Sequence, residues 1–379
     1  MKKNLLNHGR SVALCATVMT ACAVAHAAGS VTLYGVVDTG FEWVNNTPAS
    51  TGGRASVFRA VSGSRSGSRW GFRGNEDLGG GNSAFFVLEN GFGSTDGTFG
   101  QSTAGLGKGA STTTREFGRM AYVGIGHSGQ KLMLGRQQSL PYDYAGIYDP
   151  MAVATRYSLY SLDPLLALRA DNSIKYAGAF GPVTLNAMYS TRYDTGYGSE
   201  VPGAELTGRE FSFGATYANG PLAAGIVYEQ LNSNTVATNT ASQRRLEVGA
   251  AWQAGRAKVY GGYRYLRTDS GFLPAFPVAA PDGGRALYGN LYWLGLNYQI
   301  TPAWSVTGAA YYEDFLHTKA DPLLLTAVTN YALSKRTDLY VTGAFARNSH
   351  GSTLGVNGFG TVAAGANQVA INCGLRHRF

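Results

Sequence analysis

The chain has little charge, little proline and almost no cysteine. Charged residues make up 14% of its 379 residues, well below the roughly 25% that is usual in soluble domains. It has 12 prolines against 52 glycines, and the glycines follow no three-residue repeat, which excludes a collagen-like fibre. Beyond residue 27 there is no run of 18 apolar residues, so a bundle of membrane-spanning helices is excluded too. A weakly charged chain rich in glycine and tyrosine is suited to many short strands.

The first 27 residues have the three parts of a secretory signal. Three basic residues precede an apolar stretch at 12–25, and residues 25–27 read Ala-His-Ala, an A-x-A cleavage site. We therefore expect a signal peptide over 1–27 and a single domain over 28–379. The alternatives are a buried N-terminal helix and lipoprotein processing at Cys22, whose preceding residues match the lipidation pattern poorly.

Cysteine and charge limit how the exported chain can be stabilised. Cys15 and Cys22 belong to the signal, so only Cys373 remains and no disulfide can form within the chain. The signal also carries three basic residues and no acidic one, which leaves +5 of the total net charge of +8. Without disulfides, an exported chain of this size must be held by its own hydrogen bonds and packing, or by a membrane.

Apolar and polar residues alternate along the mature chain with the period of a β-strand. The pattern is clear in 31–43, 245–252, 304–313 and 368–379. The polar face is often Gly, Ser, Thr, Asn or Arg, as expected for a wall that faces water. Aromatic residues lie near the ends of the apolar faces, which is typical of the two interfaces of a membrane barrel: Trp43, Trp252, Trp304, Tyr331 and Phe379.

Connections between the predicted strands alternate between short and long. The short ones carry turn residues and fall at 76–81, 127–129, 181–182, 219–221, 254–255, 301–302 and 334–338. The long ones fall near 45–56, 93–114, 137–168, 194–208, 231–243, 268–285, 315–321 and 348–366. Seven turns and eight loops join sixteen strands. The pattern predicts an all-β fold, a sixteen-stranded antiparallel transmembrane β-barrel, closed because lipid offers no hydrogen bonds to a strand edge. Both chain ends would lie on the short-turn, periplasmic side.

Five segments in this order carry a family resemblance: residues 30–38 (SVTLYGVVD), 68–81 (SRWGFRGNEDLGGG), 171–176 (DNSIKY), 331–338 (YALSKRTD) and 374–379 (GLRHRF). Together they resemble the Gram-negative general porins of betaproteobacterial type. The resemblance spans the mature chain. It implies a homotrimeric outer-membrane porin for the passive diffusion of small hydrophilic solutes and ions.

The resemblance also carries expectations about parts and partners. It implies a third loop folded into the lumen as a constriction, although 137–168 lacks a clear match to the acidic-aromatic core of that loop. Phe379 resembles the C-terminal aromatic residue that the barrel-assembly machinery reads. We expect contact with outer-membrane lipid and lipopolysaccharide, and no nucleic acid. No cofactor or metal is expected, since the mature histidines are far apart in the sequence.

Strand parity nominates basic residues for the pore wall. In 68–74, Trp70 and Phe72 would face lipid, so Arg69 and Arg73 would face the lumen. The same reasoning, with Met120 and Tyr122 outward, places Arg119 inside.

A third segment adds two more basic candidates. In 169–176, Ile174 and Tyr176 would face out, which places Arg169, Asp171, Ser173 and Lys175 inside. Arg69, Arg119 and Arg169 also match positions of the family's basic cluster. The alternative is that these arginines only pair with acids in the lumen. Arg136 is in phase with two leucines, and parity does not place it.

The acidic side of the constriction is expected from the long connection at 137–168. It holds Asp143, Asp149 and Asp163 together with three tyrosines. A connection of this length without a strand pattern tends to be functional. Charges of opposite sign across the pore would orient dipolar solutes, although each of these acids could instead lie in an ordinary exposed loop.

The sequence favours a non-enzymatic general diffusion porin with a preference for anions. A substrate-specific outer-membrane channel is the first alternative, because loop sequence does not separate the two. A barrel-borne enzyme would need a nucleophile beside a base and an orienting group. His317 and His350 lie near Asp314 and Ser349, and such pairs occur by chance. A purely adhesive or structural barrel is the last alternative.

Overall fold

The structure is a computed structural model that describes residues 29–50, 52–100, 115–272, 284–316, 318–357 and 362–379. The predicted signal peptide lies outside these residues. Within the described ranges, no helix is both long and apolar enough to cross a membrane.

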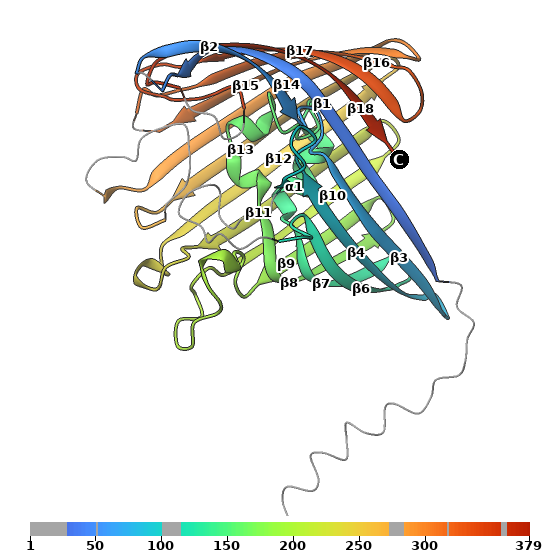
Figure 1. Ribbon diagram of the computed structural model, residues 1–379. Helices are drawn as coiled ribbons and strands as arrows, with labels where there is room; N and C mark the ends of the chain where they lie inside the picture. Colours follow the sequence, from blue (N-terminus) through green and yellow to red (C-terminus); the bar gives the residue numbers. More distant parts are fainter. Residues whose placement is uncertain (1–28, 51, 101–114, 273–283, 317, 358–361) are drawn as a thin grey trace, which may run out of the picture.

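Antiparallel strands make up most of the described chain (Figure 1). In order they are β1 (Ser30–Pro48), β2 (Arg54–Ser62), β3 (Arg69–Gly79), β4 (Asn82–Phe92), β5 (Phe99–Gly100), β6 (Met120–His127), β7 (Gln130–Gln138), β8 (Arg169–Phe180), β9 (Val183–Ser190), β10 (Glu210–Asn219), β11 (Leu222–Asn232), β12 (Ser242–Ala254), β13 (Ala257–Thr268), β14 (Leu287–Thr301), β15 (Trp304–Phe315), β16 (Leu323–Ala332), β17 (Thr337–Arg347) and β18 (Gln368–Arg378). The helical elements are α1 (Leu140–Tyr148), η1 (Leu159–Ser161), η2 (Pro164–Ala167), η3 (Thr195–Tyr197) and η4 (Val236–Thr238).

The strands close into a barrel through the two ends of the chain. One edge of β1 pairs with β18, from Val36 opposite Arg378 to Val44 opposite Ala370. The other edge of β1 pairs first with β3 and then with β2, so these two share one position in the wall. The short β5 pairs only with the end of β4. The described strands therefore form the predicted closed antiparallel barrel of sixteen strands.

The connections alternate in length as the sequence predicts. Short connections join β3 to β4, β6 to β7, β8 to β9, β10 to β11, β12 to β13, β14 to β15 and β16 to β17. The first long connection is an exception, because β1 continues to Pro48 and β2 begins at Arg54. Parts of the loops predicted at 93–114, 268–285, 315–321 and 348–366 lie outside the described residues.

Side chains alternate between the two faces of the wall in the predicted register. In β1, Val31 and Leu33 are 66% and 54% exposed, whereas Asp38 and Glu42 are fully buried. Cys373, on the apolar face of β18, is exposed. This arrangement leaves an apolar outer surface that requires lipid and a polar inner surface that can hold water.

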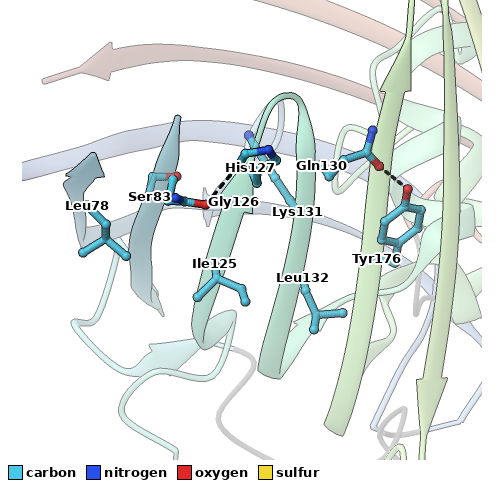
Figure 2. Close-up of a pocket in the computed structure, with 10 residues that line it drawn as sticks. Leu78, Ser83, Ile125, Gly126, His127, Gln130, Lys131, Leu132 and Tyr176 are labelled. Atoms are coloured by element: carbon cyan, nitrogen blue, oxygen red, sulfur yellow. Dashed lines mark hydrogen bonds between the residues drawn. The ribbon is translucent and has the colours of Figure 1, made fainter. Parts of the chain in front are cut away.

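The outer surface has a shallow pocket of about 300 Å³ near the short-turn end of β4, β6, β7 and β8 (Figure 2). Ile125 and Leu132 are paired across β6 and β7 at its base. At its rim, the Tyr176 hydroxyl donates to the side-chain oxygen of Gln130. Because Ile125 is exposed on the outer face, this pocket faces the lipid side and is not part of a path through the barrel.

Candidate functional site

The connection between β7 and β8 begins with the only α-helix among the described residues. The hydroxyl oxygen of Ser139 caps helix α1 by accepting from the backbone N–H of Tyr142 at 3.4 Å, and Pro141 lies in the first turn, where its missing N–H costs no helical bond. The helix ends at Asp149, whose backbone N–H donates to the carbonyl of Ala145 at 2.8 Å. The sequence places an aspartate, Asp143, in the first turn, close to the helix N-terminus, where negative charge is stabilising.

Helix α1 packs against the inner face of the wall near β10, β11 and β12 (Figure 1). The Tyr148 ring lies over Gly249 of β12, where a Cβ would come within 2.4 Å of the ring. The indole N–H of Trp293 donates to the Tyr148 carbonyl at 3.1 Å. The Tyr144 hydroxyl accepts from the Asn186 side chain at 3.0 Å. Glycine on the wall and aromatic residues on the helix thus hold α1 close to the strands.

The three arginines proposed for the basic side come together around the ring of Tyr142 on α1. The guanidinium carbon of Arg169 lies 4.5 Å from the ring centroid, and Arg119 is hydrogen-bonded to the phenol. Arg119 Nε also lies 2.6 Å from a carboxylate oxygen of Glu89, and Arg69 Nε lies 3.6 Å from the other. Residues from β3, β4, β8 and two connections therefore form one cluster.

The arginines differ in their access to water. The side chain of Arg69 is 27% exposed and that of Arg119 only 5%, and Arg169 is buried as well. Of the three arginines, Arg69 is the most accessible from the interior of the barrel. The charges of the two buried arginines are screened less than they would be in water.

Arg119 lies inside for a different reason from the one the sequence suggested. Val123 and Ile125 are exposed on the outer face, and Met120 pairs with the buried Glu89. Met120 and Tyr122 therefore face the interior, and the predicted parity of these two residues is wrong. Arg119 precedes the first residue of β6, so it escapes the alternation, and its backbone N–H donates to the Glu89 carbonyl at 3.1 Å.

Two further basic candidates lie on the inner face. Arg73 is exposed there, with its guanidinium carbon 5.4 Å from the centroid of the Tyr34 ring. Lys175 forms an ion pair with Asp143 of α1 and donates to the Gln138 carbonyl at 3.2 Å. The Asp143 side chain is 37% exposed, so this ion pair adjoins the aqueous interior.

The other two predicted acids are buried and do not face the open lumen. Asp149 accepts from the Tyr311 hydroxyl at 2.5 Å and from the backbone N–H groups of Met151 and Val153. Burial raises the pKa of Asp149, against the opposing effect of these hydrogen bonds.

Asp163 lies between two arginines of the wall, Arg245 of β12 and Arg264 of β13. Burial alone would raise its pKa, but the two guanidinium charges outweigh burial and lower it. Asp149 and Asp163 are therefore anchors that fasten the loop to β15, β12 and β13. Their burial departs from the prediction that both face the pore.

Parity reasoning missed Glu89, the carboxylate that joins Arg69 to Arg119. A signal was present, because Glu89 is the only acidic residue in β4, where an uncompensated charge would be costly.

The structure also shows the contacts of Arg136, which strand parity does not place. The β7–β8 register shifts between Gly135 and Gln137, and the Arg136 guanidinium bonds Asp171 together with the carbonyls of Gly118 and Arg169. Asp171 also pairs with Arg115, so this carboxylate is neutralised by two arginines.

No group of three or more His, Cys, Asp or Glu side chains that could hold a metal ion occurs in the part of the chain that the structure describes. The site thus consists of fixed charges and tyrosines between a loop and a wall.

Comparisons with known proteins agree with this architecture. The family model described as Gram-negative porin matches residues 11–351. An outer membrane porin protein of Bordetella pertussis is 30% identical over 94% of this chain and 96% of its own length. Outer membrane porin protein 32 of Delftia acidovorans is 31% identical over 96% of this chain and 97% of its own. The solved structure of an anion-selective porin from Comamonas acidovorans is 26% identical, with a TM-score of 0.77 over 93% of this chain and all of that one.

Proposed function

The chain belongs to the Gram-negative porin family, and from that premise we propose that it forms an anion-preferring channel whose narrowest part lies between helix α1 and the Arg69–Arg119–Arg169 cluster. It is a multi-pass outer-membrane protein that conducts small hydrophilic solutes and ions passively and has no enzymatic role. Relatives over almost the whole chain support this reading, and the similar solved porin is itself described as anion-selective.

The observation that carries the anion preference is the charge of the cluster around Tyr142. Arg69, Arg119, Arg169 and Lys175 bring four positive charges, and Glu89 and Asp143 bring two negative ones. The cluster therefore carries an excess of positive charge, and it lies beside the partly exposed loop side chains Tyr142 and Asp143. Fixed charges on the wall of a narrow aqueous pore select the ions that pass, so anions are favoured.

A fixed loop supports the same proposal. Connection 139–168 is held at Asp149, at Asp163 and by the packing of Tyr148 on Gly249. A loop fastened at several points keeps the distance between charged groups constant. We infer that it narrows the pore permanently and sets the size of the solutes admitted.

The trimer and the other partners are also inferences. The outer face of β1 and β2 carries a stacked pair, Phe41 and Phe58, whose ring centroids are 5.6 Å apart. Both are more than half exposed in the single chain. Such a surface suits either lipid or a second copy, and membership of the family favours a homotrimer. Lipopolysaccharide and the barrel-assembly machinery remain predictions from the resemblance.

Planar bilayer recordings of the purified protein test the channel. A salt gradient across the bilayer gives the ratio of chloride to potassium permeability from the reversal potential. We expect a ratio above one, with conductance steps grouped in threes. A ratio below one contradicts the anion preference. Conductance that saturates with one solute would instead favour a substrate-specific channel.

A further inference from the structure

We propose that Tyr142 makes the anion preference of the pore depend on pH, because its phenol lies among the arginines of the basic cluster and can cancel one of their charges by losing its proton. The inference rests on the proposed channel function and adds a named residue and a pH response to it. While its hydroxyl is protonated, Tyr142 is neutral and contacts the arginines around it. When the proton leaves, it becomes a fixed negative charge.

The geometry places the phenol against three cations at once. Arg169 lies over the face of the ring at 4.5 Å, an arrangement that cations and aromatic rings favour. Arg119 is hydrogen-bonded to the hydroxyl oxygen, and the charge of Arg69 reaches the same group. The ring packs partly against the apolar residues under the loop and remains partly exposed. Tyr142 is thus fixed by protein on one side and open to water on the other.

Other charged and titratable groups surround the cluster. Glu89 forms ion pairs with Arg119 and Arg69, and it also accepts from the Tyr34 hydroxyl at 2.9 Å. Asp143 follows Tyr142 in the helix and is paired with Lys175, with Tyr122 of β6 near the same carboxylate. These two acids are already engaged with cations. The cluster keeps an excess of positive charge after these pairs are counted, and this charge lies close to the phenol of Tyr142.

Tyr160 of η1 completes the surroundings and offers a comparison within the same loop. It lies near Arg169, Arg119 and Tyr142, and burial raises its pKa despite the two arginines. For Tyr142, burial acts in the same direction, but the charges of Arg169, Arg119 and Arg69 and the hydrogen bond from Arg119 outweigh it and lower the pKa. Of these two tyrosines, only Tyr142 has a pKa that its surroundings lower.

The sign of the effect follows from the charges. Below the pKa of Tyr142 the phenol is neutral and the cluster keeps its full positive excess. Above that pKa the phenolate neutralises part of the excess, since arginine stays protonated throughout. Anion preference should therefore fall as the pH rises through the pKa of Tyr142.

Reversal potentials measured in a salt gradient from about pH 7 to about pH 10 test the proposal. All proteins carry Lys175→Arg, because lysines also release protons in alkaline solution. With Tyr142 present, we expect the chloride-to-potassium ratio to fall by about two- to fivefold, as one charge at about 4 Å in a largely aqueous pore would produce. Tyr142→Phe keeps the ring over Arg169 and removes the ionisable hydroxyl, so its ratio should stay level.

Tyr160→Phe is the matched control. Its permeability ratio should change with pH in the same way as that of the parent, which here is the protein that carries Lys175→Arg alone. The difference in ultraviolet tyrosinate absorbance between the parent and Tyr142→Phe reports the ionisation directly, even if conductance is altered by the substitution. Equal pH profiles for the parent and Tyr142→Phe, or no ionisation below the ordinary tyrosine range, would overturn the proposal. A parent that prefers cations at pH 7 would instead refute the proposed anion preference, and the shift between the two pH values would still test Tyr142.

Discussion

Individual charged residues inside this barrel fall into two kinds, according to their burial. Asp163 of the loop and Arg245 and Arg264 of the wall are fully buried, and Asp163 pairs with both arginines. Arg69 and Asp143 remain open to water. A buried charge that loses its partner cannot be rehydrated, whereas an exposed one can. Stability and selectivity should therefore depend on different residues.

Replacing Asp163 by Asn should destabilise the protein strongly. The substitution removes the carboxylate that Arg245 and Arg264 share and leaves each arginine with one remaining acid, Glu229 for Arg245 and Glu313 for Arg264. Loss of a partner from a buried ion pair costs up to about 3–5 kcal/mol. We expect the barrel to unfold at a lower temperature. The measurement is the temperature at which the band of the folded protein on a gel is replaced by that of the unfolded protein. Asp77→Asn is the control, because Asp77 is exposed near the end of β3, where its charge can be lost at a cost of about 1 kcal/mol or less. Equal stability of the two variants would show that Asp163 does not anchor the loop.

Replacing Arg69 by Gln should reduce the preference for anions. Arg69 is the most accessible arginine of the cluster. Its charge lies in the proposed narrow part of the pore, where screening is incomplete. Arg54→Gln removes an equal charge from an exposed position at the start of β2, where salt screens it within about 8–10 Å. The chloride-to-potassium ratio should fall in the first variant and stay near that of the parent in the second. The reverse order would place the selective charges outside the cluster.

Sequence parity could predict that Arg69, Arg73, Arg169 and Lys175 face the interior. The family resemblance, not parity, implied that Arg69, Arg119 and Arg169 form one basic cluster. It could not predict the part of Glu89, because pairing across strands needs the register. It misjudged Met120 and Tyr122, because it assigned these two residues to the lipid face and then placed Arg119 opposite them, although Arg119 lies before the strand begins. It also could not separate Asp143 from the buried acids, since charge type alone does not report burial.

At the scale of elements, the strands and the loop helix obey different rules. Strands follow the period of two that lipid on one side and water on the other require. Helix α1 has no lipid contact to guide it and is held by aromatic side chains that fit small residues of the wall. Strand positions and turns were therefore predictable from the sequence, whereas the helix within 139–168 was not.

Replacing Gly249 by Ala should displace α1. The added Cβ would lie within 2.4 Å of the Tyr148 ring, which is closer than atoms can pack, so the ring must move. Overpacking of this kind costs about 1–3 kcal/mol. We expect lower thermal stability and a single-channel conductance that differs from the parent.

Gly308→Ala is the matched control for this change, because a Cβ there would meet no atom within 4 Å. It should leave both the stability and the conductance of the protein near the parent values. If Gly249→Ala behaves like Gly308→Ala, the helix does not depend on close packing against β12.

At the scale of the whole molecule, the last residue completes the barrel. Phe379 exchanges two backbone hydrogen bonds with Gly35 of β1, each 3.1 Å long, and its ring lies directly over that glycine. A Cβ at position 35 would come within 2.3 Å of the ring. The terminal aromatic residue therefore covers a gap in the outer face at the point where the two ends meet.

Deleting Phe379 should lower the yield of assembled protein. The deletion removes both hydrogen bonds and the cover over Gly35, in addition to the predicted assembly signal. Heat-modifiable trimer on a gel measures the outcome. Phe379→Tyr keeps the backbone bonds and the ring, so it should assemble at close to the parent level. A deletion variant with the parent yield would contradict the role of this residue.

The pairing of β1 with β18 also governs the order of folding. Asn372 and Phe41 are hydrogen-bonded across this pairing although they are 331 positions apart in the chain. Strands that are adjacent in the sequence can form hairpins early. Strand β1, however, can pair with β18 only after β18, the last strand of the chain, has been made. Contacts this distant in sequence carry a large loop-closure entropy and form late. Until then the sheet has two unpaired edges, each able to pair with another chain. The growing sheet therefore needs protection from aggregation until the last eleven-residue strand arrives.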